Sequence, residues 1–303
     1  MNNFFSKNGP IISTYFLIAI SFWVIFLIII PQLYMLDLSF RPNLPPLLRG
    51  GEEDVYTLTH YKHFLFGSET SKDSYNFVDL NVFFKTLATA VVITILSLCF
   101  CYPIAFYIAK VAEHKTARLL IVSLIVPFWI NELLRAFALR ILFAGEGVIN
   151  NALINAGLMD NAINFIGQDV ALFTGLTYAY LLLMMFPLYN SLESLDTNQL
   201  EAAKDLGSST LRTHWRVVIP HAKAGIASGS TMVFMLTAGA LATPVVLSSP
   251  NTLWFTQLIY QWFKMNDNWS RGAAYSVLLL LVSVVFVLLM MKLFRVKVGE
   301  IVK

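Results

Sequence analysis

Six long apolar blocks constrain the fold of this chain more than any other feature of its sequence. They cover about residues 13–36, 82–109, 118–144, 170–190, 225–247 and 272–294. A block of about 18 or more apolar residues with few charges is typical of a helix that spans a lipid bilayer. Charged residues make up only 13% of the chain, about half of the fraction in soluble domains. The sequence therefore predicts an all-α integral membrane protein with six transmembrane helices.

Basic residues between the blocks predict the orientation of the chain. Lys and Arg follow the second, fourth and sixth blocks, whereas the loop from about Gly145 to Asp169 contains neither. Because cytoplasmic loops are enriched in Lys and Arg, both termini are expected in the cytoplasm. The first block is longer than the apolar region of a signal peptide and no small-residue cleavage site follows it, so we expect a permanent span.

The connection between the fourth and fifth blocks, about residues 191–224, carries the most informative motif. It contains Glu201-Ala202-Ala203-Lys204-Asp205-Leu206-Gly207 and ends with Val217-Val218-Ile219-Pro220. Acidic residues suit the first turn of a short helix beginning at Glu201, and Gly207 suits its end. The spacing of Leu211, Trp215 and Val218 predicts a second amphipathic helix, after which Pro220 redirects the chain toward the membrane. These two helices are expected to form a rigid knob for a soluble partner.

This segment resembles the EAA loop of the permease subunits of ABC importers. Glu201, Ala202, Ala203, Gly207 and Pro220 match its spacing, while Val217 and Ile219 replace the usual Ile and Leu. Similarity to the spermidine/putrescine-type subfamily comes from Pro127-Phe128-Trp129, Gly147-Val148-Ile149-Asn150 and Asp267-Asn268-Trp269. The resemblance covers roughly residues 82–292. It does not cover residues 1–81, which contain the first span and a long periplasmic loop. It also does not cover the cytoplasmic tail, residues 293–303.

The resemblance implies a type I ABC importer in a bacterial inner membrane. Its expected partners are a second permease subunit in a heterodimer, two cytoplasmic ABC ATPases and a periplasmic solute-binding protein. The loop would be the coupling helix that contacts an ATPase, through Glu201, Ala202, Ala203, Asp205, Gly207 and Pro220. ATP and Mg²⁺ would be bound by the ATPases. This chain is expected to bind no cofactor and no metal and to hydrolyse nothing, since it has no Gly-rich phosphate-binding loop and no convincing histidine cluster.

Candidate residues for the substrate path lie in the third and fourth blocks. Glu132, Arg135 and Arg140 interrupt the third block, where a charge at the bilayer centre costs about 2.5–3.5 kcal/mol and is expected to face protein or water. Glu132 and Arg135 are i, i+3 neighbours, so an intrahelical ion pair is one interpretation and a role in the path is the other. A cationic polyamine would be attracted to Glu132, Trp129, Tyr178 and Tyr180. Arg135 and Arg140 instead favour an anionic or zwitterionic solute.

The fifth block is rich in small and hydroxylated residues, which are expected to pack closely against the partner permease or, alternatively, to line a gate. Pro244 is expected to kink its outer end. Two other functions are alternatives to the importer. An ion-coupled carrier is disfavoured because no inverted repeat is visible, and a membrane enzyme is disfavoured because no catalytic constellation is present. The basic residues form no stripe, so no nucleic-acid partner is expected.

Overall fold

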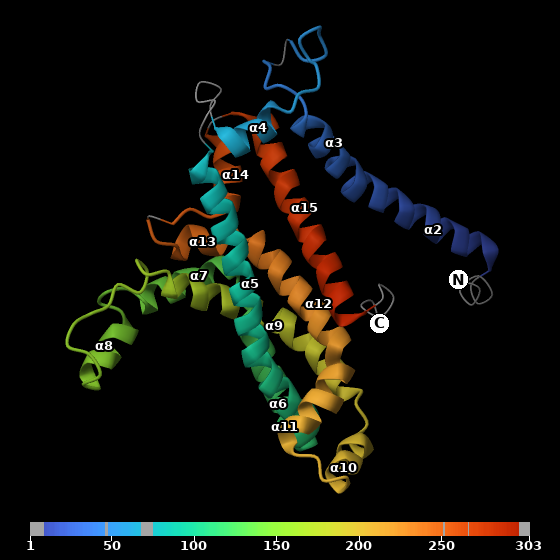
Figure 1. The fold of residues 1–303 in the computed structure, drawn as a ribbon, viewed down its shortest axis with the longest axis vertical. Helices are drawn as coiled ribbons and strands as arrows, with labels where there is room; N and C mark the ends of the chain where they lie inside the picture. The colour runs from blue at the N-terminus through green and yellow to red at the C-terminus, as the bar shows by residue number, and fades with distance from the viewer. Residues whose placement is uncertain (1–8, 46–47, 68–74, 251, 266, 297–303) are drawn as a thin grey trace. The chain divides into compact units, whose positions relative to one another are not determined.

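The structure of the chain, a computed structural model, describes residues 9–45, 48–67, 75–250, 252–265 and 267–296. Every regular element within those ranges is a helix (Figure 1). The chain forms two compact units: unit 1 comprises Met1–Asn76 and Ile259–Leu278, and unit 2 comprises Phe77–Leu258 and Leu279–Lys303. Of the predicted tail, residues 297–303 lie outside the described residues.

Unit 1 contains one long apolar helix and a partly folded connection. Helix α2 (Pro10–Val24), a π-helical turn (Ile25–Ile29) and α3 (Ile30–Ser39) are continuous, and Thr14–Ser39 is long and apolar enough to cross a membrane. This helix agrees with the predicted span 13–36. The connection after it ends in α4 (Thr59–Phe66). Helices α14 (Phe255–Lys264) and α15 (Trp269–Phe294) have residues in both units.

Unit 2 is built on a bundle of three helices that all pack against one another. They are α5 (Phe77–Phe106), which a π-helical turn extends to Val111, α9 (Val170–Glu193) and α12 (Ile219–Ala238). Figure 1 shows α5, α9 and α12 running side by side. Phe234 of α12 also stacks on Phe286 of α15, with ring centroids 3.6 Å apart. Among the described helices, α5 with its extension, α9 and α15 join Thr14–Ser39 as four elements long and apolar enough to span a membrane.

The third apolar block does not form one straight helix. Helix α6 (His114–Ile125) leads into a 3₁₀ turn (Val126–Trp129), and α7 (Glu132–Leu142) then departs at an angle of 94°. The Asn131 side chain caps α7 by accepting a 2.9 Å hydrogen bond from the Leu133 amide. Counting this bent pair as one span raises the number of described spans to five. The predicted total of six is therefore not reached by length and hydropathy alone.

The fifth apolar block is also broken, but not at the expected residue. Helix α12 ends at Ala238, and a short helix α13 (Ala242–Leu247) follows. The interruption precedes Pro244, which lies in the first turn of α13, where its missing N–H leaves no intrahelical bond unmade. The prediction of a break near the outer end of this block was thus correct, but the prediction that Pro244 causes it was wrong. Helix α12, which contains the small and hydroxylated residues together with His221 and Lys223, is not among the described helices that are apolar enough to count as a span.

Those small residues pack inside this chain, which corrects the expectation that they face the partner permease. A Cβ at Gly225 would lie 2.5 Å from the Pro187 carbonyl oxygen, and one at Gly229 would lie 2.8 Å from the Met184 sulfur. Both neighbours belong to α9. The glycines of α12 therefore allow the backbones of α9 and α12 to approach closely, as small residues do between membrane helices.

Candidate functional site

The 191–224 loop folds as two helices around Gly207. Helix α10 spans Thr197–Asp205 and α11 spans Thr210–Thr213. Gly207 has φ of +73°, which is unstrained only without a Cβ. The Gly207 amide donates to the Lys204 carbonyl at 2.8 Å and the Ser208 amide to the Ala203 carbonyl at 3.0 Å. These two bonds form a Schellman motif, so Gly207 ends the helix as the sequence predicted.

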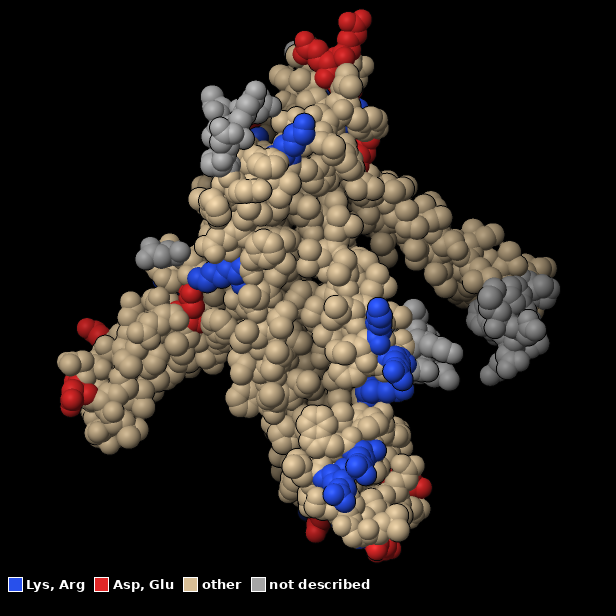
Figure 2. All heavy atoms as spheres, viewed as in Figure 1, with Lys and Arg blue, Asp and Glu red and all other residues tan. Residues whose placement is uncertain are grey.

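The first helix of the loop begins earlier than predicted. Its N-cap is Asp196, whose carboxylate accepts a 3.0 Å hydrogen bond from the Asn198 amide. Glu201 therefore lies in the middle of α10 and not in its first turn, because the capping side chain starts the helix at Thr197. Charged side chains gather at this end of unit 2, around α10 and α11, in Figure 2. Three large apolar side chains nevertheless stand exposed on the loop: Leu206 at 88%, Leu211 at 70% and Trp215 at 64%.

The second helix of the loop continues directly into the bundle. Helix α11 is followed by a π-helical turn (His214–Val218) and then by α12 without interruption. The Ile219 amide donates to the His214 carbonyl, and Pro220 follows in the first turn of α12. Pro220 therefore does not redirect the chain as predicted. The wider π turn accommodates a residue that has no N–H to donate, and it makes α11 a rigid extension of α12.

Several contacts tie this loop to α5 and its π-helical extension. The Tyr102 hydroxyl of α5 and His214 Nδ1 are 2.7 Å apart and hydrogen-bonded, and the Phe106 ring lies 4.5 Å from the His214 ring. Lys110 Nζ donates to the carbonyl oxygens of Glu193, at 3.0 Å, and Leu195. A lysine at these carbonyls favours the end of α9. These contacts connect the loop to α5 and to the end of α9, in addition to its direct continuation into α12.

Glu132 is the centre of a second group of candidate residues, separate from the 191–224 loop. It is the first residue of α7 and therefore lies at the 94° break. The sequence had instead predicted a position in the middle of a span. Its Oε1 atom accepts hydrogen bonds from the Thr243 hydroxyl at 2.8 Å and from the Tyr180 hydroxyl at 3.4 Å. Glu132 and Tyr180 line a cavity of about 290 Å³ whose other walls come from the end of α12 and the start of α13. Two broken helices therefore present a carboxylate to one open space.

Arg135 forms a different set of contacts from the one that helical spacing indicated. Its Cζ atom lies 4.7 Å from the Phe128 ring centroid and 5.5 Å from the Tyr178 centroid. Among the described residues, no ion pair within 4.0 Å joins Glu132 to Arg135. The intrahelical ion pair is thus not formed. Trp129 is 85% exposed, whereas Arg140 donates to the Val246 carbonyl and ties α7 to α13.

A third cluster, which sequence reasoning missed, surrounds Asp169 just before α9. Its Oδ2 atom accepts from the Thr252 hydroxyl at 2.8 Å and from Lys85 Nζ at 3.4 Å, and its Oδ1 atom accepts from the Ser249 amide at 3.2 Å. Asp169 has φ of +59°, in the left-handed region. Lys85 near the start of an apolar block was the available signal, but its partner lies 84 residues away. The cluster joins the start of α9 to α5 and to the segment after α13.

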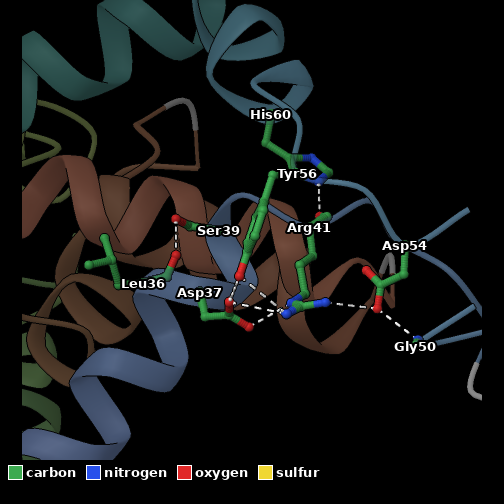
Figure 3. Close-up of polar contacts among 8 residues, drawn as sticks. All are labelled: Leu36, Asp37, Ser39, Arg41, Gly50, Asp54, Tyr56 and His60. Atoms are coloured by element: carbon green, nitrogen blue, oxygen red, sulfur yellow. Dashed lines mark hydrogen bonds and ion pairs between the residues drawn. The ribbon is translucent and has the colours of Figure 1, made fainter. Parts of the chain in front are cut away.

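Unit 1 contains a polar network at the end of α3 (Figure 3). Arg41 donates to Asp37 at 2.6 Å and to Asp54 at 2.9 Å, and the Tyr56 hydroxyl donates to Asp37 at 2.8 Å. The neighbouring carboxylate of Asp37 raises the pKa of Tyr56. His60 Nε2 donates to the Arg41 carbonyl at 2.9 Å, and burial lowers the pKa of His60. These bonds hold the segment between α3 and α4 against both helices.

Comparisons with known proteins bear on the whole chain. Residues 102–298 match the family described as "Binding-protein-dependent transport system inner membrane component". The chain is 31% identical over 261 residues to a protein of Haemophilus influenzae named "Spermidine/putrescine transport system permease protein PotB", with 86% of each chain covered. It is 32% identical over 269 residues to the Escherichia coli protein of the same name, covering 88% of this chain and 92% of that protein.

Solved structures share the fold. A crystal structure of a bacterial ABC transporter involved in the import of alginate contains a chain that is 16% identical, with a TM-score of 0.69, covering 97% of this chain and 99% of that one. A chain of the MetNI methionine ABC transporter, in an inward-facing conformation, is also 16% identical, with a TM-score of 0.55, covering 71% of this chain and 94% of that one. The helical arrangement described above is therefore the fold of ABC importer permeases.

Proposed function

This chain belongs to the family of binding-protein-dependent transport system inner membrane components, and from that premise we propose that it conducts a polyamine, such as spermidine or putrescine, across the inner membrane. It is a permease subunit of an ABC importer and a transport component, not an enzyme. The relatives named for spermidine and putrescine share about a third of its residues over most of its length. The solute assignment rests on them and on the Glu132 cluster.

The observation that carries the solute assignment is the Glu132 carboxylate at an open cavity, hydrogen-bonded by Thr243 and Tyr180. A carboxylate that faces open space beside aromatic rings attracts an ammonium group. The two arginines of α7 argued for an anionic or zwitterionic solute. Arg140 is engaged with the Val246 carbonyl, and Arg135 lies against two aromatic rings, which leaves Glu132 as the charge that lines the cavity.

The proposal assigns coupling to the 191–224 loop. Glu201, Ala202, Ala203 and Asp205 lie on α10, Gly207 ends it, and Pro220 lies where α11 continues into α12. The exposed side chains of Leu206, Leu211 and Trp215 are suited to burial in a cleft on an ATPase. ATP-driven movement of that ATPase would then act on α12 through the continuous helix. ATP and Mg²⁺ would stay with the ATPases.

The proposed assembly contains this permease, a second permease, two ATPases and a periplasmic binding protein. Six crossings result if the four apolar helices are joined by the bent pair α6 and α7 and by α12. Helix α12 needs little hydropathy of its own, because α5 and α9 cover much of its surface. An even number of crossings puts both termini on the same side of the membrane, and the Lys and Arg residues after the second, fourth and sixth apolar blocks favour the cytoplasm as that side.

The test is uptake by the complete importer in proteoliposomes, with the binding protein outside and ATP inside. We expect ATP-dependent uptake of radiolabelled spermidine or putrescine, and a loss of most uptake in Glu132→Gln. Glu146→Gln is the matched control, since it removes the same charge from an exposed position just after α7.

Three results would overturn parts of the proposal. Uptake of a zwitterion or an anion without any polyamine uptake would overturn the solute. Uptake driven by an ion gradient in the absence of ATP would overturn the importer mechanism. Wild-type uptake by Glu132→Gln would remove Glu132 from the path.

A further inference from the structure

The Phe128 and Tyr178 rings form an aromatic pair in unit 2 that already holds a cation. Phe128 comes from the 3₁₀ turn before the helix break, Tyr178 comes from α9, and their ring centroids are 6.3 Å apart. The guanidinium of Arg135 lies over both rings, at 4.7 and 5.5 Å from the centroids. The negative face of an aromatic ring attracts a guanidinium and an ammonium by the same electrostatics.

The guanidinium is held by the rings without a full set of hydrogen bonds. Its Nε and Nη1 atoms are buried and have no hydrogen-bond partner among the described residues. A buried donor without an acceptor is unfavourable. The Arg135 side chain can therefore leave this position without breaking a hydrogen bond from its Nε or Nη1 atom. A side chain placed only to brace the fold is normally satisfied by acceptors, as Arg140 is by the Val246 carbonyl.

The aromatic pair lies beside the proposed path. Arg135, whose guanidinium lies over both rings, follows Glu132 by one helical turn on α7, so the two side chains lie on the same face of that helix. A polyamine carries several ammonium groups, and one carboxylate neutralises only one of them. A second recognition element for a cation next to Glu132 is therefore what such a solute requires.

We propose that Phe128 and Tyr178 form a second binding site for an alkylammonium group, and that Arg135 occupies it as a tethered placeholder until a solute displaces it. This inference rests on the proposed function, because it takes the solute to be a polyamine. It assigns Arg135 the role of a competing cation that keeps the empty site closed to other cations.

The placeholder makes a prediction that a structural brace does not. Removing a group that competes for a site raises the apparent affinity for the ligand, by the inverse of the fraction of molecules in which the site was free. Removing a side chain that only stabilises the fold lowers the apparent affinity. The experiment uses nanodiscs that contain the complete complex of both permeases and both ATPases, without binding protein, and measures equilibrium binding of radiolabelled spermidine.

We expect Arg135→Gln to bind spermidine about tenfold more tightly than the wild type, as for a site that is occupied nine-tenths of the time. Adding Tyr178→Leu to Arg135→Gln is expected to reverse that gain, because it removes a face of the site itself. Arg140→Gln is the matched control. It removes an equal charge from the same helix, so a gain of the same size there would show that long-range electrostatics is responsible and would overturn the placeholder.

Unchanged or weaker binding by Arg135→Gln would also overturn the placeholder. If the wild-type importer still takes up spermidine with ATP, that result leaves the proposed function standing, whereas a wild-type importer that takes up no polyamine refutes the proposed function itself. Should Arg135→Gln fail to assemble by size-exclusion chromatography, Arg135→Lys keeps the charge and the apolar stem but not the planar group. A smaller gain is expected there, and a loss of affinity would overturn the placeholder.

Discussion

The Thr243 hydroxyl donates a 2.8 Å hydrogen bond to the Glu132 carboxylate, across 111 residues of sequence. This bond joins the first turn of α13 to the first residue of α7, so the two broken apolar blocks meet at one carboxylate. The meeting point is also a wall of the cavity to which we assign the solute.

Thr243→Val replaces the donor with a methyl group of similar shape. Glu132 then keeps only the longer bond from Tyr180, so its carboxylate is less well positioned. A hydrogen bond to a charged group contributes about 1.5–3 kcal/mol, and we expect spermidine uptake at low concentration to fall about tenfold. Thr243→Ser keeps the hydroxyl and should stay near the wild type. Equal uptake by the valine and serine variants would show that this bond does not serve transport.

Gly207→Ala tests the turn between α10 and α11. A Cβ at φ of +73° costs about 1–2 kcal/mol. Relief of this strain should shift α10 and weaken its contact with the ATPase. We expect fewer solutes imported per ATP hydrolysed, measured in proteoliposomes. Asn tolerates the left-handed region, so Gly207→Asn should lie between the wild type and the alanine variant. Full coupling in Gly207→Ala would contradict the role of this turn.

Gly225→Ala tests the contact between α9 and α12. Its Cβ would lie 2.5 Å from the Pro187 carbonyl oxygen and 2.6 Å from the Ser191 Cβ, so the two helices must separate. Overpacking of this kind costs about 1–3 kcal/mol, and the thermal unfolding temperature in detergent should drop. Gly145→Ala is the control, because a Cβ there meets nothing within 4 Å. Equal unfolding temperatures for the two variants would contradict the close packing.

The His60 bond to the Arg41 carbonyl should make the network of unit 1 sensitive to pH. Burial lowers the pKa of His60, so the folded network favours the neutral ring. The unfolded segment, with an ordinary His pKa of about 6.5, binds more protons as the pH falls. The stabilisation is therefore complete above about pH 6.5 and is lost as the pH falls through the lower pKa of the folded state.

Hydrogen exchange of residues 52–66 measures that effect. We expect their protection to decline between about pH 7 and 5 in the wild type, and to lose this dependence in His60→Gln. His114→Gln, at the start of α6 in the other unit, is the control. A decline that persists in His60→Gln would assign the pH dependence to another group.

Part of the fold could be predicted because it depends on local properties of the chain. A helix in a bilayer satisfies its own backbone hydrogen bonds, so a long apolar block is enough to place a span. Thr14–Ser39, α9 and α15 lie close to their predicted ranges for this reason. Gly207 could be placed at the end of α10 because the left-handed conformation there suits glycine.

The helix breaks could not be predicted from apolar blocks. The blocks 118–144 and 225–247 remain predominantly apolar across Ile130-Asn131 and across Gly239 to Leu241, so hydropathy does not reveal that the chain turns there. Asp196 likewise started α10 before Glu201, since one capping side chain outweighs the weaker preference of acids for a first turn.

The amino-acid sequence by itself determined the class of protein, the position of most apolar helices and the turn in the 191–224 loop, because bilayer insertion and backbone conformation are decided by neighbouring residues. Only the tertiary structure decided the partners of the charges. Helical spacing made an ion pair between Glu132 and Arg135 one of two interpretations, but the fold brought Thr243 and Tyr180 to the carboxylate and Phe128 and Tyr178 to the guanidinium. A buried charge takes the best partner within a few ångströms, and packing between helices far apart in the sequence sets which groups are that close.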